Sequence, residues 1–370
     1  MTVFPRDVFQ GLNQLRSVLA ENFKLCCKAT LPAGFDITKC LAPSDEISSC
    51  ESLLRSHIYR VFLVLLASLA VVGNLFSFLV RVFFTKSGSK QGVGGGSVGR
   101  SGHSVFVLNL CVSDLLMGVY LVMIGVADLV YQGTYLWEEG NWRKSPVCQM
   151  AGFLSLLSNE VSALIICLIT LDRFLAIRFP FSRFHFSPAS SRWACLVMWT
   201  LGVVLAATPL LPVTSHWAFY SQTGICIPLP VSRRSFPGQH YVFSVIIVFN
   251  FFVFLLIAAG QASVYAAMTT NAFVTADASS RKAQDLVVAR RLLVIVVTDF
   301  LCWFPIGLLG LLATGGVPIP GEVNVAMVIL VLPLNSALNP FLYTVNMLLE
   351  RRQRAKEEKL LKLVLSARDK

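Results

Sequence analysis

The chain has 370 residues, of which 55% are hydrophobic and only 14% are charged, and its formal net charge is +11 at pH 7. This composition is too apolar for an ordinary soluble domain of this length, so the sequence predicts a polytopic membrane protein. Basic segments beside anionic membrane lipid account for the positive charge, and nucleic acid is not needed as a partner.

The first predicted element is an extracellular segment, residues 1–57. Its stretch "FPRDVFQGLNQLRSVLAEN" spaces apolar residues as about one leucine-rich repeat does. Because a single repeat cannot bury its own apolar face, we interpret it as the last repeat of a larger array; the alternative is an amphipathic stretch whose spacing arose by chance. A hinge with four cysteines follows: Cys26, Cys27, Cys40 and Cys50. Adjacent cysteines rarely bond each other, but the sequence leaves the pairing otherwise open.

Seven apolar segments follow the hinge, each of about 20 residues or more, the length needed to cross a bilayer. They lie near residues 58–84, 104–128, 147–177, 192–212, 240–268, 286–313 and 322–345. The predicted fold class is therefore an all-α membrane protein, a seven-transmembrane helix bundle over residues 58–345.

The distribution of basic residues sets the predicted orientation. With the N-terminus outside, the inner loops, the inner span edges and the tail hold 20 of the 31 Lys and Arg residues, and the outer loops hold four. Since basic residues near span ends stay on the cytoplasmic side, the N-terminus is predicted to be extracellular. After the last span, residues 346–370 mix leucine clusters with Lys and Arg, which predicts a cytoplasmic amphipathic helix on the inner leaflet; a solvated tail helix is the alternative.

Three acidic residues lie deep in predicted spans, Asp114, Glu160 and Asp299, and no Lys or Arg lies at a matching depth. Such acids must be protonated, be hydrogen-bonded by amides and hydroxyls, or hold a cation. The cation option suits Asp114, because oxygen ligands from the third and seventh spans can converge at its depth, as a hard cation requires. These ligands are Ser162, Asn335, Ser336 and Asn339. An allosteric sodium ion is the one cofactor that the sequence suggests.

Two proline-bearing motifs predict hinges in the last two spans: "CWFP", Cys302 to Pro305, and "NPFLY", Asn339 to Tyr343. Proline in a membrane helix frees a backbone carbonyl and bends the helix. Taken singly, each motif is explained equally well by a static kink. The third span adds "TLDRFLAIRFP", which places an Asp172–Arg173 pair at its inner end.

In combination these features resemble the rhodopsin-like G-protein-coupled receptors, and the resemblance covers residues 58–345. The matching elements occur in chain order: "GN" at Gly73–Asn74, "NLCVSD" ending at Asp114, Cys148, "DRF" at Asp172–Phe174, Trp199, "CWFP" and "NSALNPFLY". The resemblance implies a plasma-membrane receptor that transmits an extracellular signal to a heterotrimeric G protein.

The same resemblance implies roles for individual residues. Cys148 pairs with Cys226, and Arg173 is held at rest by Asp172 and by Asp285 until the sixth helix moves outward. Two further matches are implied to be structural, Asn74 and Trp199. The residues implied to change their arrangement on activation are Asp299, Trp303, Pro305, Asn335, Asn339, Pro340 and Tyr343. For Asp299 we hypothesise hydrogen bonds to amides of the seventh span that restrain the sixth helix.

Longer stretches resemble the leucine-rich-repeat receptors, most closely the relaxin-family peptide receptors: "DLLMGVYLVMIGVADL", "SNEVSALI", "GICIPLP" and "TDFLCWFPI". This implies a relaxin-like or insulin-like peptide hormone as ligand and a G protein that stimulates adenylyl cyclase. Two departures stand out in the fifth span: Gln261 replaces a tyrosine, and the proline common in the wider class is absent, as it is in these relatives.

Other classes fit the residues less well. A seven-span transporter or channel predicts repeated halves, which the sequence lacks, and leaves the Asp172–Arg173 pair unexplained. An enzyme would need paired catalytic carboxylates, a metal-ligand cluster or a nucleophile with its base, and none is recognisable. Ser155 and Pro333 stand where amine receptors and opsins need an aspartate and a lysine. The main alternative is a truncated or orphan receptor that signals constitutively or not at all, or that forms a homodimer without hormone.

Overall fold

The computed structural model describes residues 8–9, 11–12, 14–42, 47–88, 102–179, 185–227, 237–272, 298, 300–302, 304–313, 315, 317, 319–345 and 348. Among them, six helical stretches are long and apolar enough to cross a membrane: His57–Phe83, Gly102–Val130, Pro146–Arg178, Pro188–Leu210, Gln239–Ala267 and Met327–Thr344. A shorter apolar helix, Phe300–Ala313, falls within the predicted sixth span. The described residues thus form the predicted all-α transmembrane bundle. The predicted tail helix, 346–370, lies outside the described residues apart from Leu348.

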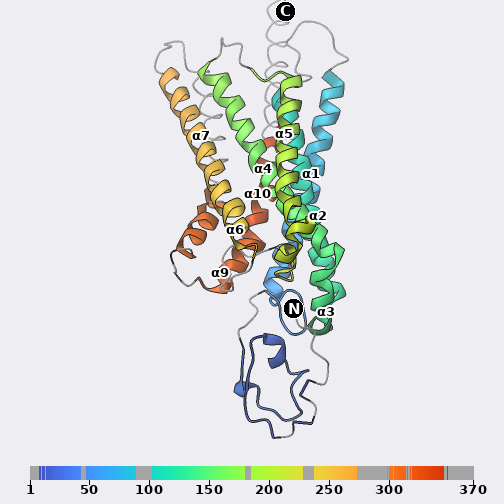
Figure 1. Cartoon of the computed structure of the whole chain (residues 1–370). Helices are drawn as coiled ribbons and strands as arrows, with labels where there is room; N and C mark the ends of the chain where they lie inside the picture. Colours follow the sequence, from blue (N-terminus) through green and yellow to red (C-terminus); the bar gives the residue numbers. More distant parts are fainter. Residues whose placement is uncertain are drawn as a thin grey trace, which may run out of the picture.

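The bundle is built from long helices that run side by side (Figure 1). They are α1 (His57–Gly88), α2 (Gly102–Val130), α4 (Pro146–Arg178), α5 (Pro188–Ala207) and α7 (Asn250–Ala272). Helix α2 packs between α1 and α4, and α4 also packs against α5 and α7. The central helix α4 therefore contacts three neighbours, and its buried polar residues are the ones best placed to join helices.

The last span and the fifth span both change helix type along their length. The last one runs from α9 (Gly321–Ala326) through the π-helix η8 (Met327–Val331) and α10 (Leu332–Pro340) to the π-helix η9 (Phe341–Val345). The fifth runs from α6 (Gln239–Val242) through the π-helix η7 (Phe243–Phe249) into α7. Such π segments are rare and occur often at functional sites.

Two helix starts follow directly from local sequence. Ser145 accepts a hydrogen bond from the Cys148 amide at 3.1 Å and is followed by Pro146, and Ser187 accepts one from the Ser190 amide at 3.1 Å and is followed by Pro188. A serine cap with proline at the first helical position is a strong start signal. Because of it, α5 begins four residues before the expected residue 192, which hydropathy alone had suggested.

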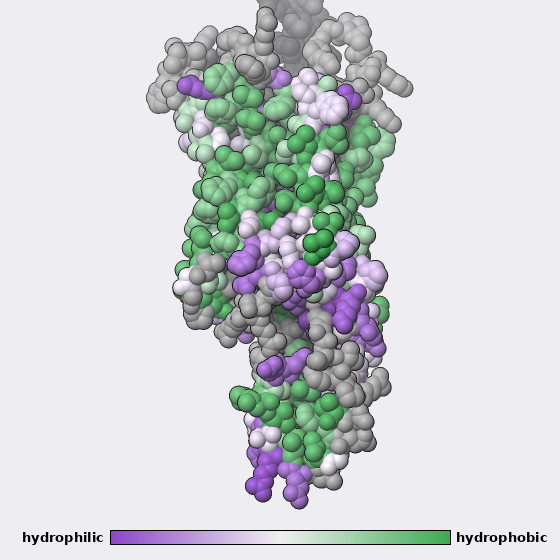
Figure 2. Space-filling model, viewed as in Figure 1, coloured by the Kyte–Doolittle hydropathy of each residue, from purple (hydrophilic) through white to green (hydrophobic). Residues whose placement is uncertain are grey.

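Apolar side chains, shown in green, cover much of the face of the bundle that Figure 2 shows. Large hydrophobic residues of the bundle are exposed, among them Trp193, Val204 and Leu256. Exposing so much apolar surface to water would be unfavourable, whereas contact of the same surface with the hydrocarbon of a bilayer is favourable. This surface agrees with a multi-pass membrane protein.

The N-terminal segment forms a small lobe at one end of the bundle (Figure 1). Strand β1 (Val18–Leu19) pairs in parallel with β2 (Cys40–Leu41). Disulfides Cys26–Cys40 and Cys27–Cys50 staple the lobe, so the structure decides the pairing that the sequence leaves open. The lobe also carries the short helices η1 (Phe23–Cys26) and η2 (Ile37–Lys39). We call this end of the bundle the outer end and the opposite one the inner end, following the predicted topology.

At the outer end, helix α3 (Tyr135–Lys144) links α2 to α4, and the short helices η4 (Thr208–Leu210), η5 (Pro212–Trp217) and η6 (Phe219–Ser221) follow α5. Hinge residues Ile47, Leu53 and Leu54 are at most 2% exposed and belong to the same apolar core as α1, α2 and α3. The hinge is therefore an integral part of the outer end and not a separate linker.

Candidate functional site

A cluster of polar side chains lies in the middle of the bundle around Asp114 of α2. One carboxylate oxygen, Oδ1, accepts a hydrogen bond from the Ser162 hydroxyl of α4 at 2.9 Å, and the other, Oδ2, accepts one from Asn339 Nδ2 of α10 at 2.8 Å. Ser336 of α10 also lies near this carboxylate. The structure thus brings three of the residues that the sequence proposed as cation ligands, Ser162, Ser336 and Asn339, close to Asp114. Hydrogen bonds from amides and hydroxyls make the buried acid tolerable without a basic partner.

The same cluster fits a small cation. Asn335 of α10 lies one helical turn before Asn339, and its Oδ1 is buried and makes no hydrogen bond among the described residues, so this acceptor oxygen is unused. Carboxylate, hydroxyl and amide oxygens are the ligands that hard cations prefer. A cation would supply the positive charge that the buried carboxylate otherwise lacks.

Asn74 and Trp199 each join two helices by a side-chain hydrogen bond. Asn74 Nδ2 of α1 donates to the Ser336 carbonyl oxygen of α10 at 3.0 Å and to the Ala70 carbonyl oxygen at 2.9 Å. Trp199 Nε1 of α5 donates to Asn109 Oδ1 of α2 at 3.0 Å. Both residues therefore occupy positions where they hold helices in register, as the resemblance implies.

Glu160 of α4 has a partner that the sequence analysis did not identify. Its Oε1 accepts a hydrogen bond from Asn250 Nδ2 of α7 at 2.8 Å, and the same amide group donates to the Val245 carbonyl oxygen in η7 at 3.1 Å. Glu160 Oε2 and Asn250 Oδ1 are buried acceptors without hydrogen bonds in the described part of the chain. A signal was available, since Asn250 is the only strongly polar residue in the run "VIIVFNFFVFLL".

A small cavity lies next to this pair. It has a volume of about 20 Å³ and is lined by Glu160 and Asn250, by Ser155 and Asn159 of α4, and by loop residues that include Tyr220 and Ile227. A cavity of this size has room for about one water molecule. The outer loop between α5 and α6 therefore fills the space above Glu160.

A disulfide and several side-chain hydrogen bonds hold the outer loop in place. Cys148 at the start of α4 is bonded to Cys226, the pairing that the resemblance implies. The Tyr120 hydroxyl donates to the Ile225 carbonyl oxygen at 3.0 Å, and Trp142 Nε1 donates to the Gly224 carbonyl oxygen at 2.7 Å. Burial raises the pKa of Tyr220 in this loop well above its usual value.

At the outer end of α2, the Asp128 carboxylate binds both the hinge and α1, and we call this set of contacts the clasp. Asp128 Oδ1 accepts a hydrogen bond from the Leu54 amide at 2.8 Å, and its Oδ2 accepts one from Arg60 Nε at 2.6 Å. Arg60 Nη2 in turn donates to the Leu54 carbonyl oxygen at 3.0 Å. Asp128 is 3% exposed, so this clasp is a buried ion pair with both backbone groups of Leu54 satisfied.

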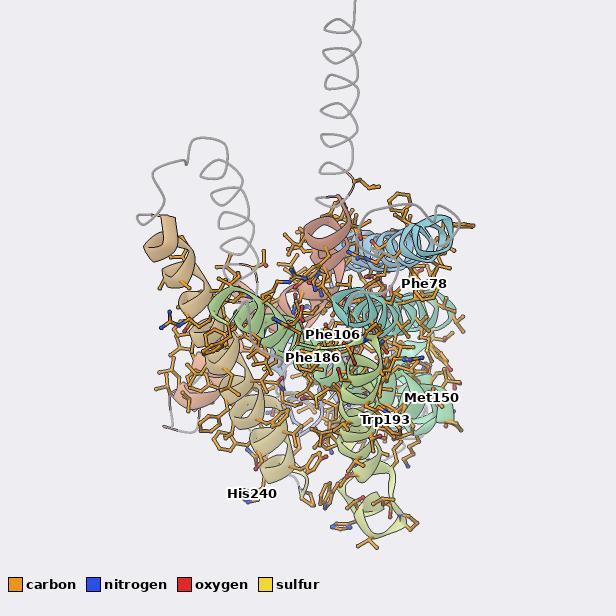
Figure 3. All side chains as sticks on the ribbon, turned by 90° about the horizontal axis from the view of Figure 1, so that it is seen from above. Phe78, Phe106, Met150, Phe186, Trp193 and His240 are labelled. Atoms are coloured by element: carbon orange, nitrogen blue, oxygen red, sulfur yellow. A yellow bond between two sulfur atoms is a disulfide. The ribbon has the colours of Figure 1, made fainter. Side chains whose placement is uncertain are left out.

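At the inner end, Asp172 lies between two groups that carry or can carry positive charge. Arg173 Nη2 is 3.5 Å from Asp172 Oδ2, and His103 Nδ1 of α2 is 3.7 Å from the same oxygen. Phe186 packs edge-on against Phe106 of α2, with ring centroids 5.2 Å apart, and Figure 3 shows the two rings together in a view along the bundle. The segment before α5 is thereby anchored close to the Asp172–Arg173 pair.

The remaining predicted residues lie partly in the described chain. Pro305 is half-buried in the helix Phe300–Ala313, and Pro340 ends α10 in a buried position. The Tyr343 carbonyl oxygen accepts a hydrogen bond from Arg81 Nη2 of α1 at 2.8 Å, a contact that the sequence analysis missed. Three predicted residues lie outside the described residues: Asp285, Asp299 and Trp303.

Gln261, the departure noted in the fifth span, also joins two helices. Its Nε2 donates to Thr170 Oγ1 of α4 at 3.0 Å, and Gln261 is 3% exposed. A tyrosine at this position would have to leave the helix interface or displace Thr170. In this chain Gln261 therefore links α7 to α4 by a side-chain hydrogen bond.

Comparison with known proteins was made for the whole chain. The family "7 transmembrane receptor (rhodopsin family)" matches residues 96–343. The G-protein coupled receptor GRL101 of Lymnaea stagnalis is 38% identical over 346 residues, which is 92% of this chain and 29% of that protein. Relaxin receptor 2 of Canis lupus familiaris is 32% identical over 91% of this chain and 44% of its own length. The thyrotropin receptor of Ovis aries is 28% identical over 85% of this chain and 38% of its own length. The chain spans less than half the length of these relatives.

Proposed function

The chain belongs to the rhodopsin family of seven-transmembrane receptors, and on that premise we propose that it is a peptide-hormone receptor that stimulates adenylyl cyclase through a heterotrimeric G protein. Membership of this family makes it a receptor and not an enzyme. Its similarity to relaxin receptors 1 and 2 supports a relaxin-like or insulin-like peptide as the hormone.

One observation supports this proposal most directly: the hinge is clasped to the bundle. Asp128 of α2 binds the Leu54 amide and Arg60 of α1 through its two oxygens. A disulfide, Cys27–Cys50, joins the same hinge to the N-terminal lobe. A hormone that moves the lobe can thus move α1 and α2 through the Cys27–Cys50 disulfide and the contacts of Asp128.

At the inner end, the Asp172–Arg173 pair supports the proposed coupling to a G protein. In this proposal Asp172 and Asp285 hold Arg173 at rest, and Asp299, Trp303, Pro305, Asn335, Asn339, Pro340 and Tyr343 rearrange on activation. Hormone binding shifts the population toward the coupling state only by its difference in affinity between the two states. Separate sites at the two ends then communicate through the helices between them.

The proposal includes a sodium ion as an allosteric ligand. Asp114, Ser162, Asn335, Ser336 and Asn339 would hold it, and its positive charge would stabilise the buried carboxylate. Because Asn339 presents its amide nitrogen to Asp114, it would have to turn its oxygen inward to join the ligands. The receptor would lie in the plasma membrane with its N-terminus outside and its tail helix against membrane lipid.

The second candidate is a receptor that signals constitutively, or not at all, without hormone capture, alone or as a homodimer. The deciding experiment joins the chain to a complete leucine-rich-repeat ectodomain and measures cAMP in transfected cells. A rise on adding relaxin-like or insulin-like peptides supports the hormone receptor, whereas unchanged cAMP with every peptide would overturn it.

The first mutation to test is Arg173→Ala. We expect loss of G-protein activation with surface expression nearly unchanged, because the Arg173 side chain is more than one third exposed at the inner end. Nucleotide exchange on the G protein, normalised to receptor on the surface, is the measurement. Arg178→Ala is the matched control, since Arg178 is an exposed arginine near the same helix end. Unchanged coupling in Arg173→Ala would exclude the proposed role.

A further inference from the structure

Helix α3 carries a buried carboxylate for which the proposed function has given no role. Glu139 lies in the middle of α3 and is 5% exposed, although α3 is part of an outer loop. A buried carboxylate needs charged or hydrogen-bonding partners to offset its lost hydration. Glu139 has two cationic partners, one on each oxygen.

The two partners of Glu139 come from different parts of the molecule. Lys24 Nζ of the N-terminal lobe forms an ion pair with Oε2, and Arg143 of α3 forms one with Oε1, one helical turn further along. Lys24 is in η1, and the two disulfides Cys26–Cys40 and Cys27–Cys50 begin within three residues of it. Because these disulfides hold the lobe together, Lys24 moves when the lobe moves.

Arg143 carries the connection on to the outer loop between α5 and α6. Its Nη1 donates to the Gln222 carbonyl oxygen at 3.1 Å, while its Nη2 is held by Glu139. The neighbouring residue, Trp142, donates to the Gly224 carbonyl oxygen of the same loop at 2.7 Å. Tyr220 and Ile227, on either side of these contacts, line the cavity beside Glu160. A continuous set of contacts thus leads from the lobe to the interior of the bundle.

Glu138, the neighbour of Glu139, shows that this arrangement is specific to one carboxylate. Its Oε2 accepts a hydrogen bond from Asn141 Nδ2 at 2.8 Å in an exposed part of the same helix. Glu138 differs from Glu139 in burial, and it forms no ion pair with the part of the lobe that the structure describes. Exposed polar contacts such as Glu138–Asn141 contribute little to stability. Removing one partner of a buried ion pair such as Lys24–Glu139, in contrast, leaves an uncompensated charge.

We propose that Glu139 is a positioning residue that couples the N-terminal lobe to the outer loop, so that a displacement of Lys24 changes how firmly Arg143 holds Gln222. This inference rests on the proposed function for its consequence in signalling, but the coupling itself is a property of the fold. Because Lys24 and Arg143 share one carboxylate, removing Lys24 changes the charge that Arg143 feels. The geometry makes Glu139 the point at which the two ion pairs interact.

The test is a double-mutant cycle on the full chain in detergent micelles, read by amide hydrogen exchange. The reporters are the amides of Cys226 and Ile227, which donate to the Thr223 carbonyl oxygen at 3.1 Å and to Thr223 Oγ1 at 3.3 Å. We expect Lys24→Gln to speed their exchange about fivefold, the lower end of usual coupling strengths. In the Glu139→Gln background, the Lys24 substitution should add nothing further.

Glu138→Gln is the matched control and should leave both amides unchanged. If Lys24→Gln leaves exchange at the two reporters unaltered, or speeds it equally with and without Glu139, the coupling is absent and the proposal is wrong. Should Glu139→Gln fail to reach the cell surface, Arg143→Gln replaces it in the cycle with the same expectation.

Signalling provides a second measurement, because release of the outer loop removes a restraint on the resting receptor. Basal nucleotide exchange on the G protein, per receptor on the surface, should rise about fivefold in Glu139→Gln and remain at the parent level in Glu138→Gln. Equal basal activity in the two variants would remove the signalling role of Glu139. If the parent and Arg173→Ala were equally inactive, the proposed function would fail while the hydrogen-exchange result still decided the coupling.

Discussion

Two acidic residues buried in the bundle, Asp114 and Glu160, differ in how hydrogen bonds offset the lost hydration of their carboxylates. Asp114 accepts hydrogen bonds on both oxygens, from Ser162 and Asn339, which come from two other helices. Glu160 accepts one on Oε1 from Asn250, while its Oε2 has none among the described residues. The protein supplies a hydrogen bond to each oxygen of Asp114, whereas Oε2 of Glu160 needs a proton or a small ligand. We therefore expect the two acids to respond differently to substitution.

This difference predicts the behaviour of Glu160 variants. Glu160→Gln retains an amide oxygen for Asn250 and should change the free energy of unfolding by less than about 1 kcal/mol. Glu160→Leu leaves the Asn250 amide with only the Val245 carbonyl as acceptor, so we expect a loss of about 1–3 kcal/mol. Thermal unfolding of the purified receptor measures both. Equal losses in the two variants would show that the carboxylate charge, and not the acceptor, stabilises this position.

At the scale of helices, the fifth span shows how a polar side chain supports an irregular segment. The π-helix η7 contains no proline, although proline is the usual cause of a local break in a membrane helix. Here Asn250, the first residue of α7, caps the Val245 carbonyl of η7 and fastens the segment to Glu160 of α4. A side chain from the following turn therefore bonds a backbone carbonyl of the π segment and ties that segment to a neighbouring helix.

Close packing between α4 and the outer loop makes Gly152 a sensitive position. A Cβ atom there would overlap the Tyr220 ring and the Cys226 carbonyl oxygen, and the Cys148–Cys226 disulfide keeps that loop from moving away. We expect Gly152→Ala to cost about 1–3 kcal/mol in the free energy of unfolding. The measurement is the thermal midpoint of the solubilised receptor. Gly125→Ala is the control, because its Cβ would meet only the flexible end of Leu63, at 3.0 Å.

At the scale of the whole molecule, the hinge and the bundle form one core. Ile47, Leu53 and Leu54 are buried together with residues of α1, α2 and α3, and the Gly133 amide after α2 donates to the Glu51 carbonyl oxygen at 2.7 Å. The lobe is in turn joined to this core by Cys27–Cys50 and by the Lys24–Glu139 ion pair. Forces on the lobe therefore act on the bundle through covalent and buried contacts.

The clasp at Asp128 should control how tightly the hinge is held. Asp128→Ala removes the acceptor for the Leu54 amide and leaves Arg60 without its carboxylate, a change that usually costs about 3–5 kcal/mol in a buried pair. Hydrogen exchange at the Leu54 amide should accelerate strongly. The control is Glu51→Ala, which removes an exposed side chain but keeps the backbone bond to Gly133. Slow exchange at Leu54 in Asp128→Ala would mean that apolar burial alone holds the hinge.

The sequence predicts those features that depend on nearby residues. Hydropathy indicates where the chain crosses the membrane, and the motifs around Asp114, Asp172–Arg173 and "NPFLY", in their chain order, resemble those of the rhodopsin-like receptors, a family that the comparison confirms. Helix starts are also local, since Ser187 and Pro188 mark the beginning of α5 better than its apolar residues do. The contacts of Glu139, Asp128 and Arg81 were missed because a charged residue near a span end is usually solvated.

The amino-acid sequence by itself determined the membrane-spanning architecture and the family. Apolar segments and short motifs can both be recognised from neighbouring residues, without knowledge of which distant residues meet. Only the tertiary structure decided which residues meet: Cys26 with Cys40, Glu160 with Asn250, and Lys24 with Glu139. The last two pairs join residues about 90 and 115 positions apart, and many partners are compatible with each charge or amide at that separation. Packing of α3, α4 and α7 selects one partner for each, since a buried polar group is stable only where a complementary group is within reach.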